Sequence, residues 1–246
     1  MLKIENTDVY GFGPAIRGMR NSWDSWENSD SYPYYLAITE EDFEEAQTDG
    51  IISEDAVFVT ETPCTLPDGT DLYCGYHVGE NDLALMKKLV AAGSDHRKFM
   101  RMIVVWADIT APLYWWKEFD TYKVGTVGNS CSTMHTIAKK SFTLDDFSHE
   151  NLWSTATMHL MDTIKILNIW RDSYNHPNAC DSYKKHCWWQ MIQLLPTSYN
   201  QRRTEMLNYE VLRNMYHARR KHKLDEWHTF CEWVESLPYS ELITED

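Results

Sequence analysis

Three polar segments of the 246-residue chain, at residues 93–96, 118–135 and 208–219, carry side chains that could hold a small charged ligand. They offer amide, hydroxyl, carboxylate and cationic groups, several of them near glycines, which allow a ligand to approach the backbone closely. The candidate side chains are His96, Glu118, Lys123, Asn129, Ser132, Asn208, Asn214 and Arg219. Taken alone, the second segment is more simply a polar turn between two elements.

The third segment has the most regular spacing. Asn208 and Arg219 are eleven residues apart, which is three turns of an α-helix, so both should project from nearly the same face. Asn214 would lie roughly 120° away and would serve the same site only at its edge. Asparagine has low helix propensity, so two in one helix suggest a role, although two tolerated surface amides are the simpler alternative.

The motifs of several well-known catalytic sites are absent from the sequence. There is no P-loop, no GxSxG and no HExxH, and Gly11-Phe12-Gly13 lacks the third glycine of a dinucleotide motif. The six cysteines form no CxxC pair and are expected to be reduced thiols, several of them buried. His217, His222 and His228 are spaced by five and six residues and do not share a helix face, so we assign no metal.

The charge of the chain narrows the classes of partner. Its 23 basic and 37 acidic residues give 23 − 37 = −14, which argues against binding to a nucleic-acid polymer. Residues 202–223 nevertheless hold seven Lys or Arg and only two Glu, which fits a small anionic ligand in an internal or intersubunit pocket. Residues 1–60 hold thirteen acids and only three bases, and Thr39–Glu45 within them is expected to begin a solvated helix. With no apolar run of membrane-spanning length and no signal-peptide core, we expect a soluble cytoplasmic protein.

Apolar periodicity predicts the elements that must position these side chains. The expected helices cover residues 80–92, 113–119, about 144–172 and 183–195, with Gly93 and Pro196 as stops. Residues 102–106 form an apolar run typical of a buried strand, ended by Thr110-Ala111-Pro112, and residues 122–129 suggest a strand or a loop. Residues 61–79 are rich in turn signals, with a hairpin expected around Asp68-Gly69.

The last long helix is expected to begin at about Thr204, because Leu207, Val211 and Met215 are spaced by four. It should continue or resume through Trp227 and end before Pro238. No internal repeat, low-complexity segment or clear linker is visible. The simplest organisation is therefore a single α+β domain over residues 1–246.

The order and spacing of these features resemble the flavin-dependent thymidylate synthase family, as a divergent member of phage or prophage type. His96 is followed fifteen residues later by Ala111-Pro112, and Leu195-Pro196 precedes the final polar segment, as in that family. Asn208, Asn214 and Arg219 keep the family's offsets of zero, six and eleven. The resemblance covers about residues 80–235, with a looser echo at Ala15-Ile16-Arg17.

The chain departs from the family where the family has arginines. The motif Gln-x-x-Arg-His-Arg falls on Glu118 and Thr121-Tyr122-Lys123, which leaves one cation of three. In the following motif Asn129 and Ser132 match, but the arginine position holds Met134. Guanidinium groups bind phosphates through paired planar donors, so these losses weaken the anion clamp. Arg202, Arg203, Arg220 and Lys221 are candidates to rebuild it from a neighbouring subunit.

The resemblance implies a small, mainly antiparallel sheet packed by long helices, and a homotetramer with intersubunit sites. It implies FAD as cofactor, NADPH and methylenetetrahydrofolate as co-substrates, and transfer of a one-carbon unit to a pyrimidine deoxynucleotide, dUMP or a relative. His96, Lys123, Asn208 and Asn214 would then contact the flavin. Ser132, Asn129 and Arg219 would face the nucleotide, with Glu118 replacing a polar group beside the uracil or the flavin. No catalytic residue is assigned.

Two other interpretations remain open. The lost arginines favour a non-catalytic descendant of the same fold that acts as a binding or interaction protein. A folate- or flavin-binding protein could instead stack a planar ring on one tryptophan of the pairs Trp115-Trp116 or Trp188-Trp189. Core or subunit packing is the simpler role for these large aromatic side chains.

Overall fold

The computed structural model describes residues 2–37, 64–65 and 71–245. These residues form an α+β fold, as the sequence predicts. The chain divides into two compact units: the first comprises residues 1–5, 108–122 and 128–204, and the second comprises residues 6–107, 123–127 and 205–246. The expected helix start at Thr39–Glu45 and the turn at Asp68-Gly69 lie outside the described residues. That the whole chain is one domain stays a prediction.

Four strands form one antiparallel sheet in the order β1-β5-β7-β6. Their bounds are β1 Lys3–Tyr10, β5 Val104–Pro112, β6 Thr126–Ser130 and β7 Asn200–Asn208. Each of these strands contributes residues to both units, because the division falls within each of them. The small antiparallel sheet implied by the family resemblance is therefore confirmed.

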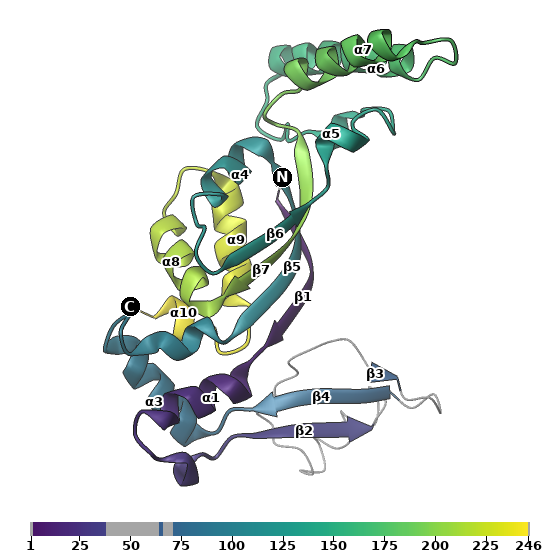
Figure 1. Ribbon diagram of the computed structural model, residues 1–246. Helices are drawn as coiled ribbons and strands as arrows, with labels where there is room; N and C mark the ends of the chain where they lie inside the picture. The colour runs from purple at the N-terminus through teal and green to yellow at the C-terminus, as the bar shows by residue number, and fades with distance from the viewer. Residues whose placement is uncertain (1, 38–63, 66–70, 246) are drawn as a thin grey trace. The chain divides into compact units, whose positions relative to one another are not determined.

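A second sheet belongs to the second unit and has the order β2-β4-β3 (Figure 1). β2 (Tyr32–Ala37) pairs antiparallel with β4 (Asp71–His77), so that Tyr32 lies opposite His77. β3 (Cys64–Thr65) pairs antiparallel with the other side of β4, with Thr65 opposite Asp71.

In the first unit, two helices form an antiparallel hairpin beside a smaller helical segment. α6 (Ser154–Tyr174) lies against α7 (Asp181–Leu194) along its length (Figure 1). The remaining helices are α4 Leu113–Phe119, α5 Thr133–Thr136 and the 3₁₀ helix η3 Leu144–Asp146. The buried cluster consists of Ile137, Ala138, Phe142, Phe147, Leu160, Ile164, Leu167 and Met191. These side chains join one face of α6 to α7 and to the segment that precedes α6.

The second unit contains the N-terminal helix α1, the helix α8, and the helices that pack against α8. Their bounds are α1 Phe12–Asn21, α3 Glu80–Ala91, α8 Tyr209–Arg219, α9 Asp225–Glu235 and α10 Glu241–Thr244, with the 3₁₀ helices η1 Trp26–Asn28 and η2 Arg97–Arg101. α8 packs against η2, α9 and α10, and buries Leu212 and Met215 completely. Gly93 follows α3 with φ +103°, the left-handed conformation that ends a helix, so the predicted stop is confirmed.

Three sequence-based boundaries are wrong. The helix expected from 144 begins ten residues later at Ser154, because Thr143 and Asp146 close a separate capped 3₁₀ turn, and Leu152 is exposed outside it. Thr110-Ala111-Pro112 does not break the strand: β5 runs through Pro112, which is its last residue and needs no ladder donor there. The predicted helices over 113–119 and 183–195 are confirmed within two residues.

The third wrong boundary concerns residues 204–208, which we expected to be helical. They belong to β7, in which Glu205 and Leu207 are buried, whereas Thr204, Met206 and Asn208 are less so. This period of two marks a strand with one face inward. α8 begins only at Tyr209, and α9 is a separate helix.

Within the described residues, no helix is long and apolar enough to cross a membrane. Cys131 and Cys180 are exposed free thiols, and Cys187 and Cys231 are buried free thiols.

Candidate functional site

Asn208 lies at the N-terminus of α8 as its capping residue. Its backbone is extended (φ −114°, ψ 163°), and its Oδ1 accepts a hydrogen bond of 2.9 Å from the backbone N–H of Val211. The amide therefore satisfies one of the free N–H groups of the first turn, which is a known preference of asparagine. Because Asn208 precedes the helix, it is not on the helical face that we expected it to share with Arg219.

The chain segment that carries Lys123 meets this cap. Gly125 has φ +85°, and a Cβ placed on it would lie 2.5 Å from Nδ2 of Asn208. Only glycine permits both the left-handed backbone and this close approach. Lys123, two residues earlier, is exposed. The structure therefore brings the segments of two candidate residues together.

His96 belongs to a third segment that reaches the same helix end. Its side chain is exposed, and the backbone turns at Gly93 so that His96 N–H donates to the Gly93 carbonyl at 3.0 Å. The next residue, Arg97, is paired with Glu210 in the first turn of α8, with Nε 2.8 Å from Oε2. The segments of His96, Lys123 and Asn208 thus converge at the N-terminus of α8.

Asn214 and Arg219 lie farther along α8. Asn214 is exposed. The guanidinium of Arg219 lies over the indole of Trp227 on α9, with its central carbon 4.9 Å from the ring centroid. This cation–π contact holds Arg219 beside α9.

The three remaining candidates belong to the first unit. Glu118 is half-buried on α4, and Asn129 is exposed on β6. Ser132 caps α5 through its backbone carbonyl, which accepts from His135 and Thr136, while its side chain makes no capping bond. Ser132 is exposed, and its hydroxyl is not engaged in capping the helix.

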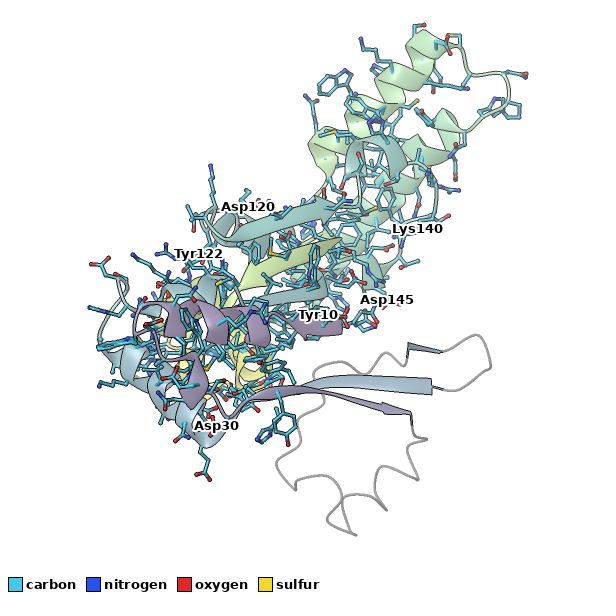
Figure 2. The ribbon with its side chains drawn as sticks, turned by 60° about the horizontal axis from the view of Figure 1, so that its bottom comes forward. Tyr10, Asp30, Asp120, Tyr122, Lys140 and Asp145 are labelled. Atoms are coloured by element: carbon cyan, nitrogen blue, oxygen red, sulfur yellow. The ribbon has the colours of Figure 1, made fainter. Side chains whose placement is uncertain are left out.

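A pocket of about 360 Å³ lies beside this segment, within the first unit. Its lining consists of Lys3, Thr110, Cys131, Thr133, Lys140, Asp145, Asp146, Tyr199, Asn200, Gln201 and Arg202; Figure 2 labels Lys140 and Asp145. The Gln201 amide donates to the Cys131 carbonyl and to Thr133 Oγ1, both at 3.2 Å. The pocket therefore includes Cys131 and Thr133, the two neighbours of the candidate Ser132. From β7 it includes Arg202, which the sequence singled out, and Asn200 and Gln201, which it did not.

The cations of this pocket already have carboxylate partners. Lys140 pairs with Asp146, and Arg202 pairs with Asp108 at 2.8 Å. Burial, with the nearby Asp146 and Cys131, raises the pKa of Tyr199, so the phenol stays protonated and can donate a hydrogen bond. The pocket suits a polar molecule of mixed donors and acceptors better than a strongly charged anion.

Arg203 on β7 is likewise occupied. Its Nη1 lies 2.7 Å from Asp120 Oδ1, and its guanidinium stacks 4.0 Å from the centre of the Trp116 ring. Trp115 and Trp116 are fully buried and packed edge to face, so the packing interpretation of that pair is confirmed. Neither Arg202 nor Arg203 has its guanidinium available to replace a lost arginine unless these pairs open.

Comparison with known proteins identifies the architecture. No family model and no curated protein matches the sequence. Among solved structures, a thymidylate synthase X from Helicobacter pylori solved with FAD and dUMP matches with TM-score 0.58 and 14% identity, covering 99% of this chain and 97% of that chain. A second structure of the flavin-dependent thymidylate synthase from the same organism, complexed with FAD and dUMP, gives TM-score 0.57 and 13% identity over 98% and 97%.

The chain has the fold of the flavin-dependent thymidylate synthases. The match includes nearly all of both chains, so the fold extends beyond the residues 80–235 from which the resemblance was drawn. At this identity the comparison shows the fold alone. The roles of the eight candidate residues stay predictions.

Proposed function

We propose that this protein catalyses an FAD-dependent transfer of a one-carbon unit to a pyrimidine deoxynucleotide, converting dUMP to dTMP or acting on a related substrate. The observation that carries this proposal is the near-complete match to two thymidylate synthase X structures solved with FAD and dUMP. The convergence of the His96, Lys123 and Asn208 segments on one helix end supports it.

The hydrogen-bond donors and positive charge at the N-terminus of α8 are of the type that binds the phosphates of an anionic dinucleotide. An exposed ammonium on Lys123 and the positive end of the helix dipole both favour phosphate oxygens. His96, Lys123, Asn208 and Asn214 are the residues that would hold FAD, with Asn208 offering Nδ2 because its Oδ1 is engaged in the cap. Bound FAD would supply the redox chemistry, with NADPH and methylenetetrahydrofolate as co-substrates.

The nucleotide would be held by the polar residues of the other segments. Ser132 would offer its exposed hydroxyl as a hydrogen-bond partner, and Asn129 its amide. Arg219 would bind the phosphate, since a guanidinium pairs with two phosphate oxygens at once. Glu118 would take the place of the polar glutamine in the related motif. These residues position the substrate, and none is assigned as a nucleophile.

We also propose that the protein is a homotetramer with sites shared between subunits. α6 buries Leu160, Ile164 and Leu167, yet its opposite face exposes Met158 (65%) and Ile169 (59%). A helix that is apolar on opposite faces is typical of one that packs on both sides. Light scattering should give four copies, and Ile169→Glu should dissociate them, whereas Lys139→Glu, at an exposed lysine outside α6, should not.

The alternative, a non-catalytic descendant that binds a nucleotide, a flavin or another protein, is favoured by one observation. Arg202 and Arg203, the candidates to restore the lost cations, are paired with Asp108 and Asp120. A cytoplasmic location and a phage or prophage type stay predictions.

The absorption spectrum of the purified protein separates these functions. Under the proposed function, the protein is yellow or takes up added FAD, and it forms dTMP from dUMP with NADPH and methylenetetrahydrofolate. Flavin uptake without turnover would favour the non-catalytic alternative. Protein that neither takes up FAD nor oxidises NADPH contradicts both the cofactor and the reaction.

Arg219 is tested by nucleotide binding rather than by turnover. Arg219→Ala should raise the dissociation constant for dUMP at least tenfold, because a charge-assisted hydrogen bond contributes about 1.5–3 kcal/mol. Arg101→Ala, which removes an exposed arginine with no assigned role, is the matched control and should leave the affinity unchanged. Arg219→Lys keeps the cation over Trp227 and should recover part of the loss, whereas equal affinity in all variants refutes the assignment.

A further inference from the structure

A second pocket, distinct from the candidate site above, lies within the second unit between the end of α1, the η1 turn and α3. Its volume is about 520 Å³, within the range of small-molecule sites. Its lining consists of Arg20, Trp23, Ser25, Asn28, Asn81, Leu85 and Lys88. None of these residues is among the eight candidate site residues named from the sequence.

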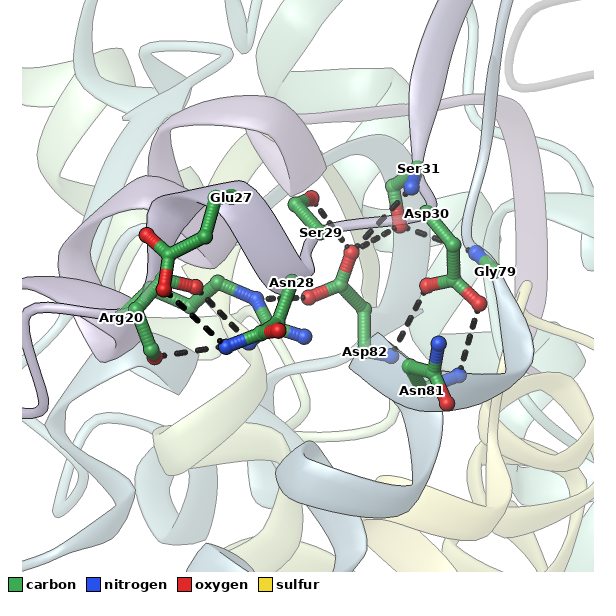
Figure 3. Close-up of polar contacts among 10 residues, drawn as sticks. Arg20, Glu27, Asn28, Ser29, Asp30, Ser31, Gly79, Asn81 and Asp82 are labelled. Atoms are coloured by element: carbon green, nitrogen blue, oxygen red, sulfur yellow. Dashed lines mark hydrogen bonds and ion pairs between the residues drawn. The ribbon is translucent and has the colours of Figure 1, made fainter.

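The floor of this pocket is a buried arginine. Arg20 is only 4% exposed, and its Nε lies 2.5 Å from Oδ1 of Asp82 (Figure 3). Its Nη1 donates to the carbonyl of Ser25 at 3.1 Å. Among the described residues, its Nη2 has no hydrogen-bond partner. Arg20 therefore lines the pocket with one guanidinium nitrogen still able to donate.

Asp82 fixes the position and the charge of that arginine. Its Oδ2 accepts from Ser29 Oγ and Ser31 Oγ, both at 2.6 Å, while Oδ1 accepts from Arg20 (Figure 3). Burial acts to raise the pKa of Asp82, but hydrogen bonds from the two serines and Arg20 outweigh it and lower the pKa overall. The carboxylate is thus charged and saturated, and it keeps Arg20 rigid rather than blocking Nη2.

The wall formed by α3 adds a cation and an amide. Asn81, Leu85 and Lys88 follow the spacing i, i+4, i+7 and so share one face of the helix. Lys88 is exposed and makes no ion pair with any residue in the described ranges. Its ammonium is therefore available to an anionic ligand at the pocket.

The opposite wall offers a planar apolar surface with a second amide. Trp23 is 61% exposed although it lines a concave site, and Asn28 lies in the adjacent turn. An exposed indole is a platform on which a nucleobase stacks. Asparagine amides match the donor and acceptor pattern of an adenine edge.

We propose that this pocket binds an adenine mononucleotide. Trp23 stacks on the base, and Asn28 and Asn81 hydrogen-bond its edge. Lys88 and the Nη2 of Arg20 bind the phosphate, whose several oxygens can accept from both cations. A free phosphate would make no contact with the Trp23 indole, and an uncharged nucleoside would make no ion pair with Lys88 or Arg20. The ligand therefore needs both its base and its phosphate.

Calorimetric titration of the full-length protein with AMP tests this proposal. AMP should bind saturably at one site per chain, and adenosine or inorganic phosphate alone should bind at least tenfold more weakly. Trp23→Ala and Lys88→Gln should each raise the dissociation constant for AMP about tenfold. Both side chains are exposed, so thermal melting should be unchanged, and either variant alone suffices if the other folds poorly.

Matched controls and competition complete the test. Trp153→Ala removes an indole that is 88% exposed in the first unit, and Lys98→Gln removes an exposed lysine outside the pocket; both should leave AMP affinity unchanged. Saturating dUMP should not displace AMP. The proposal is overturned by the absence of saturable AMP binding, by equal losses in test and control variants, or by displacement of AMP by dUMP.

Discussion

Arg20 in the second unit and Arg203 in the first unit each pair with a carboxylate, but their surroundings differ. The side chains of Arg20 and Asp82 are 5% and 0% exposed, and two serines complete the hydrogen bonds of the carboxylate. Arg203 is 17% exposed and Asp120 is 53% exposed, and the guanidinium also stacks on Trp116. The same pair of residue types is closed to water in one unit and open to it in the other.

This difference shows why the number of arginines does not tell how well a protein binds anions. A buried pair is costly to break because the remaining charge cannot be solvated. An exposed pair contributes little, because water and salt screen it. Arg20 is therefore committed to the fold with one nitrogen to spare. The carboxylate partner of Arg203 is more than half exposed, so Arg203 is the more easily released of the two.

The largest effect is expected when the buried pair is broken. Asp82→Asn removes the charge that compensates Arg20, and it should lower the free energy of unfolding by about 3–5 kcal/mol. Urea denaturation followed by circular dichroism measures this change. Pairing it with Arg20→Met should recover stability, because the double variant leaves no uncompensated buried charge. A loss below about 1 kcal/mol for Asp82→Asn would remove the contrast between the two pairs.

The buried pair should also govern stability in acid. The pKa of Asp82 is lower in the folded protein than in the unfolded chain, so its contribution is complete above about pH 4, the ordinary pKa of aspartate, and is lost as the pH falls through the folded value. Wild-type protein should therefore lose stability more steeply than Asp82→Asn as the pH falls below about 4. Parallel slopes in denaturation at a series of pH values would contradict the pKa direction.

A smaller effect is expected for Arg203→Lys. The ammonium keeps the charge near Asp120 but loses the planar stacking on Trp116, which we expect to cost about 1–2 kcal/mol of unfolding free energy. Thermal and urea unfolding measure it. An unchanged stability would mean that charge rather than stacking holds this side chain.

The smallest effect is expected for Asp120→Asn. The carboxylate is more than half exposed, so removing its charge should cost less than about 1 kcal/mol, and the loss should shrink further in 0.5 M salt. A loss as large as that of Asp82→Asn would mean that exposure does not decide the strength of these pairs.

Local signals predicted the elements that local physics controls. Gly93 ends α3 because only a residue that tolerates positive φ suits that position, and Pro196 follows α7 because it cannot continue a helix. The spacing of Asn208, Asn214 and Arg219 also led to the correct fold, although the first of the three is not helical. The low helix propensity of asparagine was the available signal that Asn208 caps the helix rather than continues it.

Local signals could not predict that residues 204–208 form part of a strand. Leu207 and Val211 are four residues apart whether or not the chain between them changes from strand to helix, so the helical spacing was satisfied by two different elements. Pairing of β7 with β5 on one side and with β6 on the other decided the outcome. Side-chain burial on one face of a sheet then outweighs local propensity.

The sequence by itself determined the residue types, the charge distribution and the order of motifs, and these were enough to predict an α+β fold and its family likeness. Only the tertiary structure decided which of those residues meet. Gly125 lies against Asn208, and Arg20 lies against Asp82, although 83 and 62 residues separate them in the chain. The physical reason is that periodicity describes neighbours within one element, whereas contacts between elements depend on how the whole chain buries its apolar faces.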